Sequence, residues 1–264
     1  MSRSLRWPIL GTLLAIAATT VMDAVGLSNF NAFPLIVLFF GFWYLQRLSH
    51  VEVGLTWGRW RDYALAVLYP VLILGLIGLI AALTGALTGT ATDWGNTVGM
   101  LVVSILVTIL LALITEEGFF RGWLWASLRR AGMTEPWVVV WTSVAFAAWH
   151  LSTALLPTDF RPPLAQVPIY ILNAAVIGVI WGLMRQRSGS IVVTSVSHGV
   201  WNGLVYTLFS VGPTLGVLGI HNTAVFGPEV GLVGLALNLV FAAVLWLGYS
   251  RAQPVSPAQP ASAV

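Results

Sequence analysis

The chain has 264 residues, of which 58% are hydrophobic and 8% are charged, and its formal net charge at neutral pH is +3. A soluble globular domain carries about 25% charged residues, so this composition excludes an ordinary soluble domain and indicates a polytopic membrane protein. The chain contains no cysteine, which excludes disulfide bonds and thiolate metal sites. All twelve basic residues are arginines scattered in short segments, so the positive charge indicates no nucleic-acid partner.

Membrane-spanning helices are predicted along almost the whole chain. Such a helix needs about 20 mostly apolar residues. Eight stretches qualify: 8–26, 32–46, 63–83, 97–128, 136–156, 166–184, 190–210 and 228–249. The sequence therefore predicts an all-α fold of about eight transmembrane helices, forming one membrane-embedded domain over residues 1–250. Residues 251–264 are rich in proline, alanine and serine, which predicts a disordered cytoplasmic tail.

The arginines predict the orientation of these helices. Eight helices place both termini on one side, and eleven of the twelve arginines, Arg121 included, fall on that side, whereas Arg161 falls on the other. Because positively charged loops stay in the cytoplasm, we expect both termini to be cytoplasmic in a multi-pass protein of the plasma membrane. The first helix follows Arg3 and Arg6 and could be a cleaved signal peptide. Asp23 and the lack of a clear small-residue cleavage site favour a retained anchor.

A few polar side chains interrupt the apolar stretches. A charged group at membrane depth costs about 2.5–3.5 kcal/mol on insertion scales, so such groups usually pair with one another or face a functional cavity. The set here is Glu116, Glu117, Arg121, His150, His198 and Asn202. Glu116 and His150 each lie seventeen residues from Met133, in the turn between the fourth and fifth stretches. An antiparallel hairpin would therefore place both at the same depth, ~18–21 Å from the helix ends at the turn.

The seventh stretch reaches the same layer. His198 and Asn202 lie about 8 and 12 residues into it, which corresponds to depths of ~12 and ~18 Å. We therefore expect one intramembrane site in a cavity that opens toward the cytoplasm. Glu117 and Arg121 are four residues apart on one helix face, which predicts an ion pair. Glu116 points about 100° away from Glu117 and is free to face the cavity.

These side chains suit hydrolysis by either of two routes. A carboxylate with a histidine can deprotonate a water molecule. A histidine with an asparagine can donate hydrogen bonds to the oxyanion that then develops on a carbonyl. A glutamate with two histidines is also a plausible zinc site with an open position for water. Both routes lead to hydrolysis of an amide or an ester, and the residues alone do not choose between them.

Three motifs in order carry a family resemblance. EEGFFR (116–121) fits EExxxR, FAAWH (146–150) fits FxxxH, and HGVWN (198–202) fits HxxxN. Each motif is weak alone, but all three on successive hydrophobic helices resemble the CPBP family of CAAX proteases and bacteriocin-processing enzymes, also called the Abi or type II CAAX prenyl endopeptidase family. The motif core covers about residues 98–210.

The resemblance implies an intramembrane endopeptidase that hydrolyses a peptide bond in a membrane-associated protein or peptide. It assigns the activation of water to Glu116 and His150. It assigns stabilisation of the oxyanion, or shaping of the site, to His198 and Asn202. The positions implied to be supporting are Glu117, Arg121 and Phe146. Its prenylated substrates do not transfer to this chain.

The resemblance leaves the cofactor open. Family members are often named metalloproteases, but a glutamate-dependent mechanism without a metal is also argued. A divalent metal such as zinc would have Glu116, His150 and His198 as its ligands.

Two alternative functions stay open at this level. Intramembrane glutamate and histidine residues also form proton relays, which would fit a proton-coupled transporter. The inverted repeats and broken helices common in transporters are not visible in the sequence. The other alternative is a non-catalytic bacteriocin-immunity or scaffold protein of the same fold. The partners that we expect are the lipid bilayer and a membrane-associated peptide.

Overall fold

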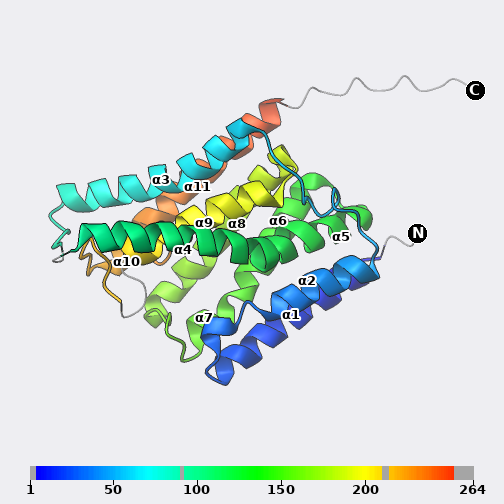
Figure 1. Cartoon of the computed structure of the whole chain (residues 1–264), viewed down its shortest axis with the longest axis horizontal. Coiled ribbons are helices and arrows are strands. Elements are labelled where there is room, and N and C mark those ends of the chain that lie inside the picture. The colour runs from blue at the N-terminus through cyan, green and yellow to red at the C-terminus, as the bar shows by residue number, and fades with distance from the viewer. Residues whose placement is uncertain (1–3, 90–91, 210–213, 253–264) are drawn as a thin grey trace, which may run out of the picture.

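The computed structural model describes residues 4–89, 92–209 and 214–252, and within them the protein is all-α, as predicted. The helices form one elongated bundle (Figure 1). In chain order they are α1 (Arg6–Ala24), the 3₁₀ helix η1 (Ser28–Phe30), α2 (Pro34–Leu45), α3 (Trp60–Leu83), α4 (Trp94–Ile114), the π-helix η2 (Glu117–Leu124), α5 (Trp125–Arg130), α6 (Glu135–Trp149), α7 (Leu151–Leu155), the 3₁₀ helix η3 (Leu164–Gln166), α8 (Val167–Ser188), α9 (Ile191–Leu208), α10 (Thr223–Phe226) and α11 (Leu232–Ala252).

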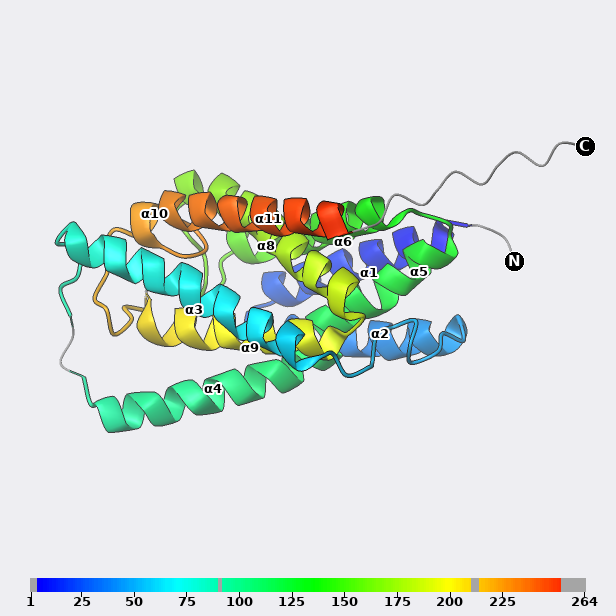
Figure 2. The ribbon, with the colours of Figure 1, turned by 90° about the horizontal axis from the view of Figure 1, so that it is seen from above.

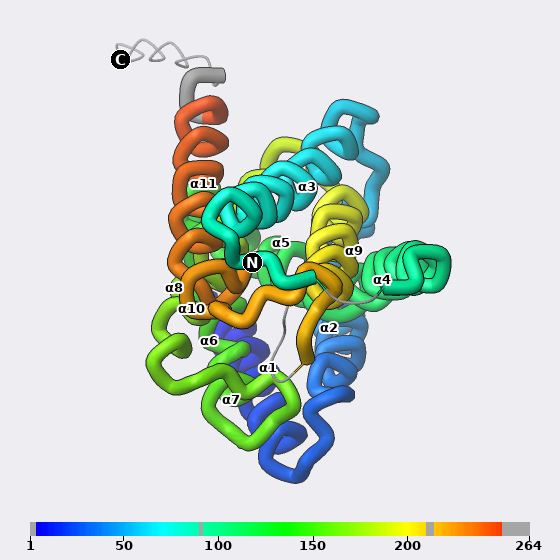
Figure 3. Tube along the Cα trace, turned by 90° about the vertical axis from the view of Figure 1, so that its left-hand side faces the viewer, coloured from blue at the N-terminus to red at the C-terminus, as the bar shows by residue number. Residues whose placement is uncertain are grey.

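The described chain contains seven segments that are long and apolar enough to cross a membrane, so this is a multi-pass membrane protein. They are Arg6–Ala24, Ser28–Leu45, Trp60–Leu83, Trp94–Arg130, Glu135–Leu155, Leu164–Ser188 and Leu232–Tyr249. The seventh predicted stretch, 190–210, forms α9, which is not among these seven segments because serines, threonines, His198 and Asn202 interrupt its apolar run. Figure 3 shows α9 lying between α3 and α4, so the helix that carries His198 and Asn202 is shielded by apolar helices.

Two glycines allow α4 to approach α9 closely. A Cβ atom on Gly199 would overlap the side chain of Ile109, and one on Gly203 would overlap Ile105. Small residues at such spacing let membrane helices pack backbone to backbone. The outer face of α4 has exposed apolar side chains, and α4 lies at the edge of the bundle in Figure 2. The helix therefore separates α9, with His198 and Asn202 beside the glycines, from the lipid.

The loop 46–59 closes the end of the bundle at which α1 begins and α11 ends (Figure 1). Arg130 donates to both carboxylate oxygens of Glu52, at 2.6 and 2.8 Å, and to the carbonyl of Gln46 at 2.6 Å. This guanidinium lowers the pKa of Glu52 from 4.5 to about 2. Arg185 donates to the carbonyls of Glu52 and Arg121, at 3.1 and 3.0 Å. Arg130 of α5 and Arg185 of α8 thus connect the loop 46–59 to these helices, and Arg185 also connects it to η2, which carries Arg121.

Two sequence predictions need adjustment at this level. Arg121 is completely buried and is not a loop residue, whereas the other described arginines on the side of the termini lie at that end of the bundle. The predicted disordered tail began at residue 251, but α11 continues to Ala252. Residues 253–264 lie outside the described part of the chain.

Candidate active site

The first motif lies on a π-helix. Helix α4 ends at Ile114, and residues Glu117–Leu124 then form one buried π-helical segment. Such segments are rare and frequently occur at functional sites. A Cβ atom on Gly118 would lie 2.6 Å from the carbonyl oxygen of Leu113 and 2.9 Å from the ring of Phe39. Only glycine therefore fits directly after the two glutamates, where the backbone changes its helical repeat.

Glu117 points into the protein core. Its Oε1 accepts hydrogen bonds from Arg121 Nη1 at 3.2 Å and from His198 Nδ1 at 3.1 Å. The side chains of Glu117 and Arg121 both have 0% exposure. The predicted ion pair is therefore confirmed, and it extends to a histidine from the third motif.

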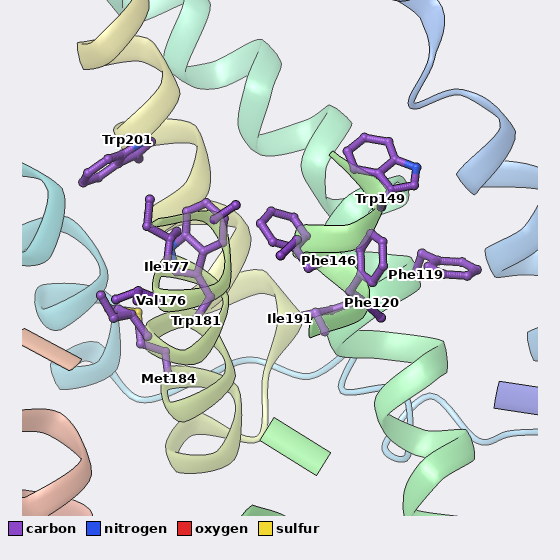
Figure 4. Packing of buried hydrophobic residues seen from close by; sticks show 14 of the residues in the cluster. Phe119, Phe120, Phe146, Trp149, Val176, Ile177, Trp181, Met184, Ile191 and Trp201 are labelled. Atoms are coloured by element: carbon purple, nitrogen blue, oxygen red, sulfur yellow. The ribbon is translucent and has the colours of Figure 1, made fainter. Parts of the chain in front are cut away.

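Aromatic rings enclose the guanidinium of Arg121. Its central carbon lies 4.2 Å from the ring centre of Phe146 and 5.4 Å from that of Trp181. Figure 4 shows these two rings close together between α6 and α8. Arg121 Nη2 also donates to the carbonyl of Gly178 at 3.4 Å. The cation is thus held by a carboxylate, a carbonyl and two ring faces, which compensates for the loss of water.

Glu116 points in the other direction, into a cavity. Its Oε2 lies 4.0 Å from His150 Nε2 and 3.9 Å from His198 Nε2. Its side chain is 17% exposed, in contrast to the fully buried Glu117. The two adjacent carboxylates therefore occupy different environments, and Glu116 is the one that a molecule in the cavity can reach.

Hydrogen bonds determine which nitrogen of each histidine faces Glu116. His150 Nδ1 lies 2.8 Å from the carbonyl oxygen of Phe146, and because a carbonyl only accepts, Nδ1 carries the hydrogen. By the same argument His198 Nδ1 donates to Glu117. In the neutral form of each ring, Nε2 then presents a lone pair toward Glu116. A bridging water molecule at about 2.8 Å from each atom suits separations of this size.

The same three atoms do not fit a zinc ion as they stand. Two ligand atoms on a tetrahedral zinc with bonds of about 2.0–2.1 Å lie roughly 3.4 Å apart. The separations of 3.9 and 4.0 Å from Glu116 to the histidines are longer. No group of three or more His, Asp or Glu side chains in the described ranges is arranged to hold a metal ion.

The cavity has a volume of about 450 Å³. Glu116, His150, His198 and Asn202, the four residues predicted to be catalytic, all line it. His198 is stacked on Trp181, with ring centres 4.2 Å apart, and His150 packs edge-on against Phe146 at 4.5 Å. The structure thus brings the four residues together in one aromatic cavity, while their catalytic roles stay predictions.

The opening of the cavity corrects one prediction. The lining includes Ser28 and Asn29 after α1, Asp159 and Phe160 after α7, and Thr214 after α9. All of these loops follow helices that run away from the terminal end of the bundle, so the cavity opens at the opposite end. The prediction of cytoplasmic termini together with a cavity open to the cytoplasm is therefore wrong. A depth of ~18–21 Å already exceeds half of a hydrocarbon core of about 30 Å, which puts the site nearer the far face.

Cysteine labelling can determine which face this is, because the chain has no cysteine of its own. Asn29 is exposed beside the cavity opening, and His50 is exposed in the loop at the terminal end. If the arginines set the orientation, a membrane-impermeant maleimide will label Asn29→Cys in intact cells and His50→Cys only after permeabilisation. The reverse pattern would place the cavity opening in the cytoplasm and contradict the arginine rule for this protein.

Asp23 has a larger role than its position in the sequence indicated. It is 2% exposed and accepts hydrogen bonds from Ser152 at 2.7 Å, Thr153 at 3.0 Å and Asn31 at 2.9 Å. These bonds join the end of α1 to α7 and to the segment before α2, beside the cavity opening. An acidic residue inside an apolar stretch was the signal that could have identified it.

Sequence analysis also missed Glu229, which lines the cavity. Its Oε1 accepts a hydrogen bond from Trp201 Nε1 at 3.1 Å. The residue falls at the beginning of the eighth predicted stretch, but its carboxylate was not counted among the intramembrane groups. Its position before an apolar run was the available signal, and only the folded chain brings it to the cavity.

Comparison with known families agrees with this site. Residues 97–204 match the model of a family described as type II CAAX prenyl endopeptidase Rce1-like. All three motifs lie within the matched segment. This segment of the chain is therefore similar to the CAAX-type membrane proteases. No curated protein matches the chain.

The family match confirms the resemblance seen in the motifs, and it covers only residues 97–204. The Rce1-like segment begins in α4 and ends in α9, so it contains the π-helix and both motif histidines. Asp23 and Glu229 lie outside it, although both side chains contribute to the cavity or its opening. The Rce1-like match therefore does not cover the parts of the cavity and its opening to which Asp23 and Glu229 contribute.

Proposed function

We propose that this Rce1-like protein is an intramembrane endopeptidase that cleaves a membrane-associated protein or peptide. The observation that carries the proposal is the convergence of Glu116 Oε2 with the Nε2 atoms of His150 and His198, at 4.0 and 3.9 Å, inside a cavity. The family match supports the reaction class, and the proposed roles rest on the chemistry of these three side chains.

The first step is the attack of water on the scissile carbonyl. A water molecule held between Glu116 and His150 donates to the carboxylate and to the free lone pair of His150 Nε2. As its oxygen forms a bond to the carbonyl carbon, one proton passes to Glu116. The carbonyl π electrons move onto the carbonyl oxygen, which becomes an oxyanion. Proton removal by a positioned base accounts typically for 10²–10⁴-fold in rate.

The second step is the collapse of the tetrahedral intermediate. Asn202 donates from its amide to the oxyanion, and His198 donates from Nε2 when the ring carries both protons. Glu117 accepts from His198 Nδ1 at 3.1 Å and so orients the ring. The carbon–nitrogen bond then breaks, and the leaving amine takes the proton from Glu116. Donors fixed in a cavity of low polarity stabilise such an oxyanion more than donors in water do.

Cleavage by the full chain in lipid vesicles tests the proposal. Wild-type protein is offered a library of membrane-anchored peptides, and products are identified by mass spectrometry. His150→Ala is expected to reduce cleavage about 100-fold or more because it removes the water-orienting nitrogen. His50→Ala, in an exposed loop, serves as the matched control.

Two outcomes would contradict the proposal. The first is that wild type cleaves no peptide that His150→Ala leaves uncut. A non-catalytic immunity or scaffold protein, or a transporter, would then be the better interpretation. If a chelator abolishes cleavage and zinc restores it, the water is activated by a metal and not by the carboxylate and histidine alone.

A further inference from the structure

The wall of the cavity is aromatic and acidic. It includes seven aromatic side chains: Phe146, Trp149, Phe160, Tyr170, Trp181, Trp201 and Tyr206. It also includes three carboxylates: Glu116, Asp159 and Glu229. No arginine is among the described lining residues, and the chain contains no lysine. Aromatic faces beside carboxylates attract cations.

Glu229 is the carboxylate that the hydrolytic mechanism leaves unused. Its side chain accepts from Trp201 Nε1 at 3.1 Å. The ion pairs among the described residues involve other carboxylates, and none of them includes Glu229. Glu117, by contrast, has Arg121 as its counter-ion. Glu229 thus presents a carboxylate without a counter-ion to the cavity.

A second set of contacts holds Glu229 in place. Asn173 donates to the backbone carbonyls of Pro228 and Glu229, at 2.8 and 3.1 Å. Asn238 donates to Asn173 Oδ1 at 2.9 Å, and Tyr69 donates to Asn238 Oδ1 at 2.9 Å. Three side chains from three helices, α8, α11 and α3, therefore support the backbone position of one cavity residue. Such preorganisation lowers the ordering cost of binding a ligand.

The same contacts position the neighbouring indole. Tyr69 is stacked on Trp201, with ring centres 5.4 Å apart and an angle of 11° between the planes. Trp201 in turn donates its indole N–H to Glu229. A glutamine could accept that hydrogen bond equally well, so a structural role alone does not require the charge of Glu229.

The charge also has an unfavourable environment. Loss of hydration raises the pKa of Glu229 above its usual value of 4.5. A carboxylate that has lost hydration and has no counter-ion is destabilising, and a cation that enters the cavity would compensate for the lost water. The ligand that best complements this part of the cavity is therefore positively charged.

We propose that Glu229, beside Trp201, binds a cationic group of the substrate, an ammonium or guanidinium from a lysine or arginine side chain or from a free peptide N-terminus. The residue would select substrates with a positive charge near the scissile bond. This assignment to a substrate rests on the proposed peptidase function, whereas binding of a cation in the cavity does not.

A binding experiment tests the cation site without any cleavage. The full chain in detergent is titrated with n-butylguanidinium and with n-butylurea, its neutral isostere, and quenching of the cavity tryptophans is recorded. Wild type is expected to bind the guanidinium at least about tenfold more tightly than the urea. In Glu229→Gln, which can keep the bond from Trp201, this ratio should fall toward one, and Glu229→Asp should retain a preference.

The controls for binding lie outside the cavity. Glu135→Gln removes a carboxylate that pairs with Arg129 at 3.4 Å, and the wild-type ratio is expected for it. Equal affinity of wild type for the two probes would overturn the proposal. An unchanged ratio in Glu229→Gln would overturn it as well.

A cleavage experiment then tests the substrate assignment. Peptides cleaved by wild type are compared in pairs that differ only by arginine or citrulline at each position near the scissile bond. At one position the arginine peptide should have a kcat/KM at least about tenfold higher, mainly through KM, and Glu229→Gln should remove this ratio. If Glu229→Gln lowers kcat for both peptides by the same factor, the assignment is wrong. If wild type cleaves no peptide of the library, the proposed peptidase function is contradicted, and the ratio of guanidinium to urea affinity still tests the cation site.

Discussion

Glu116→Gln is expected to lower the rate of peptide cleavage by about 10²–10⁴-fold while the protein stays folded. Glutamine has the shape of glutamate but cannot take a proton from water. The side chain of Glu116 faces the cavity, and its two contacts to histidine nitrogens are as long as 4.0 and 3.9 Å. Its replacement therefore removes little stabilising energy. Initial rates in vesicles, measured beside an unfolding curve, separate the loss of activity from a loss of folding.

A matched substitution shows whether this effect belongs to the cavity. Glu135→Gln alters a carboxylate that is 37% exposed at the terminal end of the bundle, and it should leave the rate unchanged. Full activity of Glu116→Gln would mean that Glu116 is not the base and that the water is activated elsewhere, with His150 Nε2 as the next candidate. The adjacent Glu117 is a poor comparison because its loss would also disturb Arg121 and His198.

Arg121→Gln is expected to destabilise the protein by about 3–5 kcal/mol, since it leaves the Glu117 carboxylate buried without its counter-ion. The pair has a separation of 3.2 Å and no exposure, so water cannot replace the missing cation. The aromatic contacts of the guanidinium with Phe146 and Trp181 are lost as well. Unfolding of the purified protein in detergent, followed by tryptophan fluorescence, measures this change.

The double variant Glu117→Gln/Arg121→Gln isolates the electrostatic part of the destabilisation caused by Arg121→Gln. Because it removes both charges together, it should be more stable than Arg121→Gln alone, and the cycle gives the coupling energy. Arg129→Gln provides the surface comparison: its pair with Glu135 is 44% and 37% exposed, and such pairs contribute about 0–1 kcal/mol. Equal losses for Arg121→Gln and Arg129→Gln would contradict the role given to the buried pair.

Much of the fold followed from local pattern. A long apolar run predicts a helix wherever it occurs in the chain, and the eight predicted stretches correspond to the eight long helical segments of the described residues. Equal offsets from Met133 correctly predicted that Glu116 and His150 would meet, because the two arms of a helical hairpin rise at the same rate. The i,i+4 spacing likewise predicted the contact between Glu117 and Arg121.

Other features do not follow from local pattern. The need for glycine at position 118, inside the π-helix, comes in part from the close approach of Phe39, which belongs to α2 and lies 79 residues earlier in the chain. The assignment of the ring hydrogens depends on contacts to Phe146 and Glu117. The equal depth of Glu116 and His150 was predicted correctly, but the side from which the cavity opens depends on how the loops after α1, α7 and α9 surround it.

The sequence by itself determined that this is a multi-pass helical membrane protein with the motifs of the CAAX-type protease family. Composition, hydrophobic length and residue spacing are properties of single segments, so they can be interpreted without a fold. Only the tertiary structure decided that Glu116 faces the cavity, that Glu117 is buried with Arg121 and His198, and that Glu229 joins the cavity wall. These facts depend on packing between distant segments, because the burial and partners of a charge are set by whichever helices surround it.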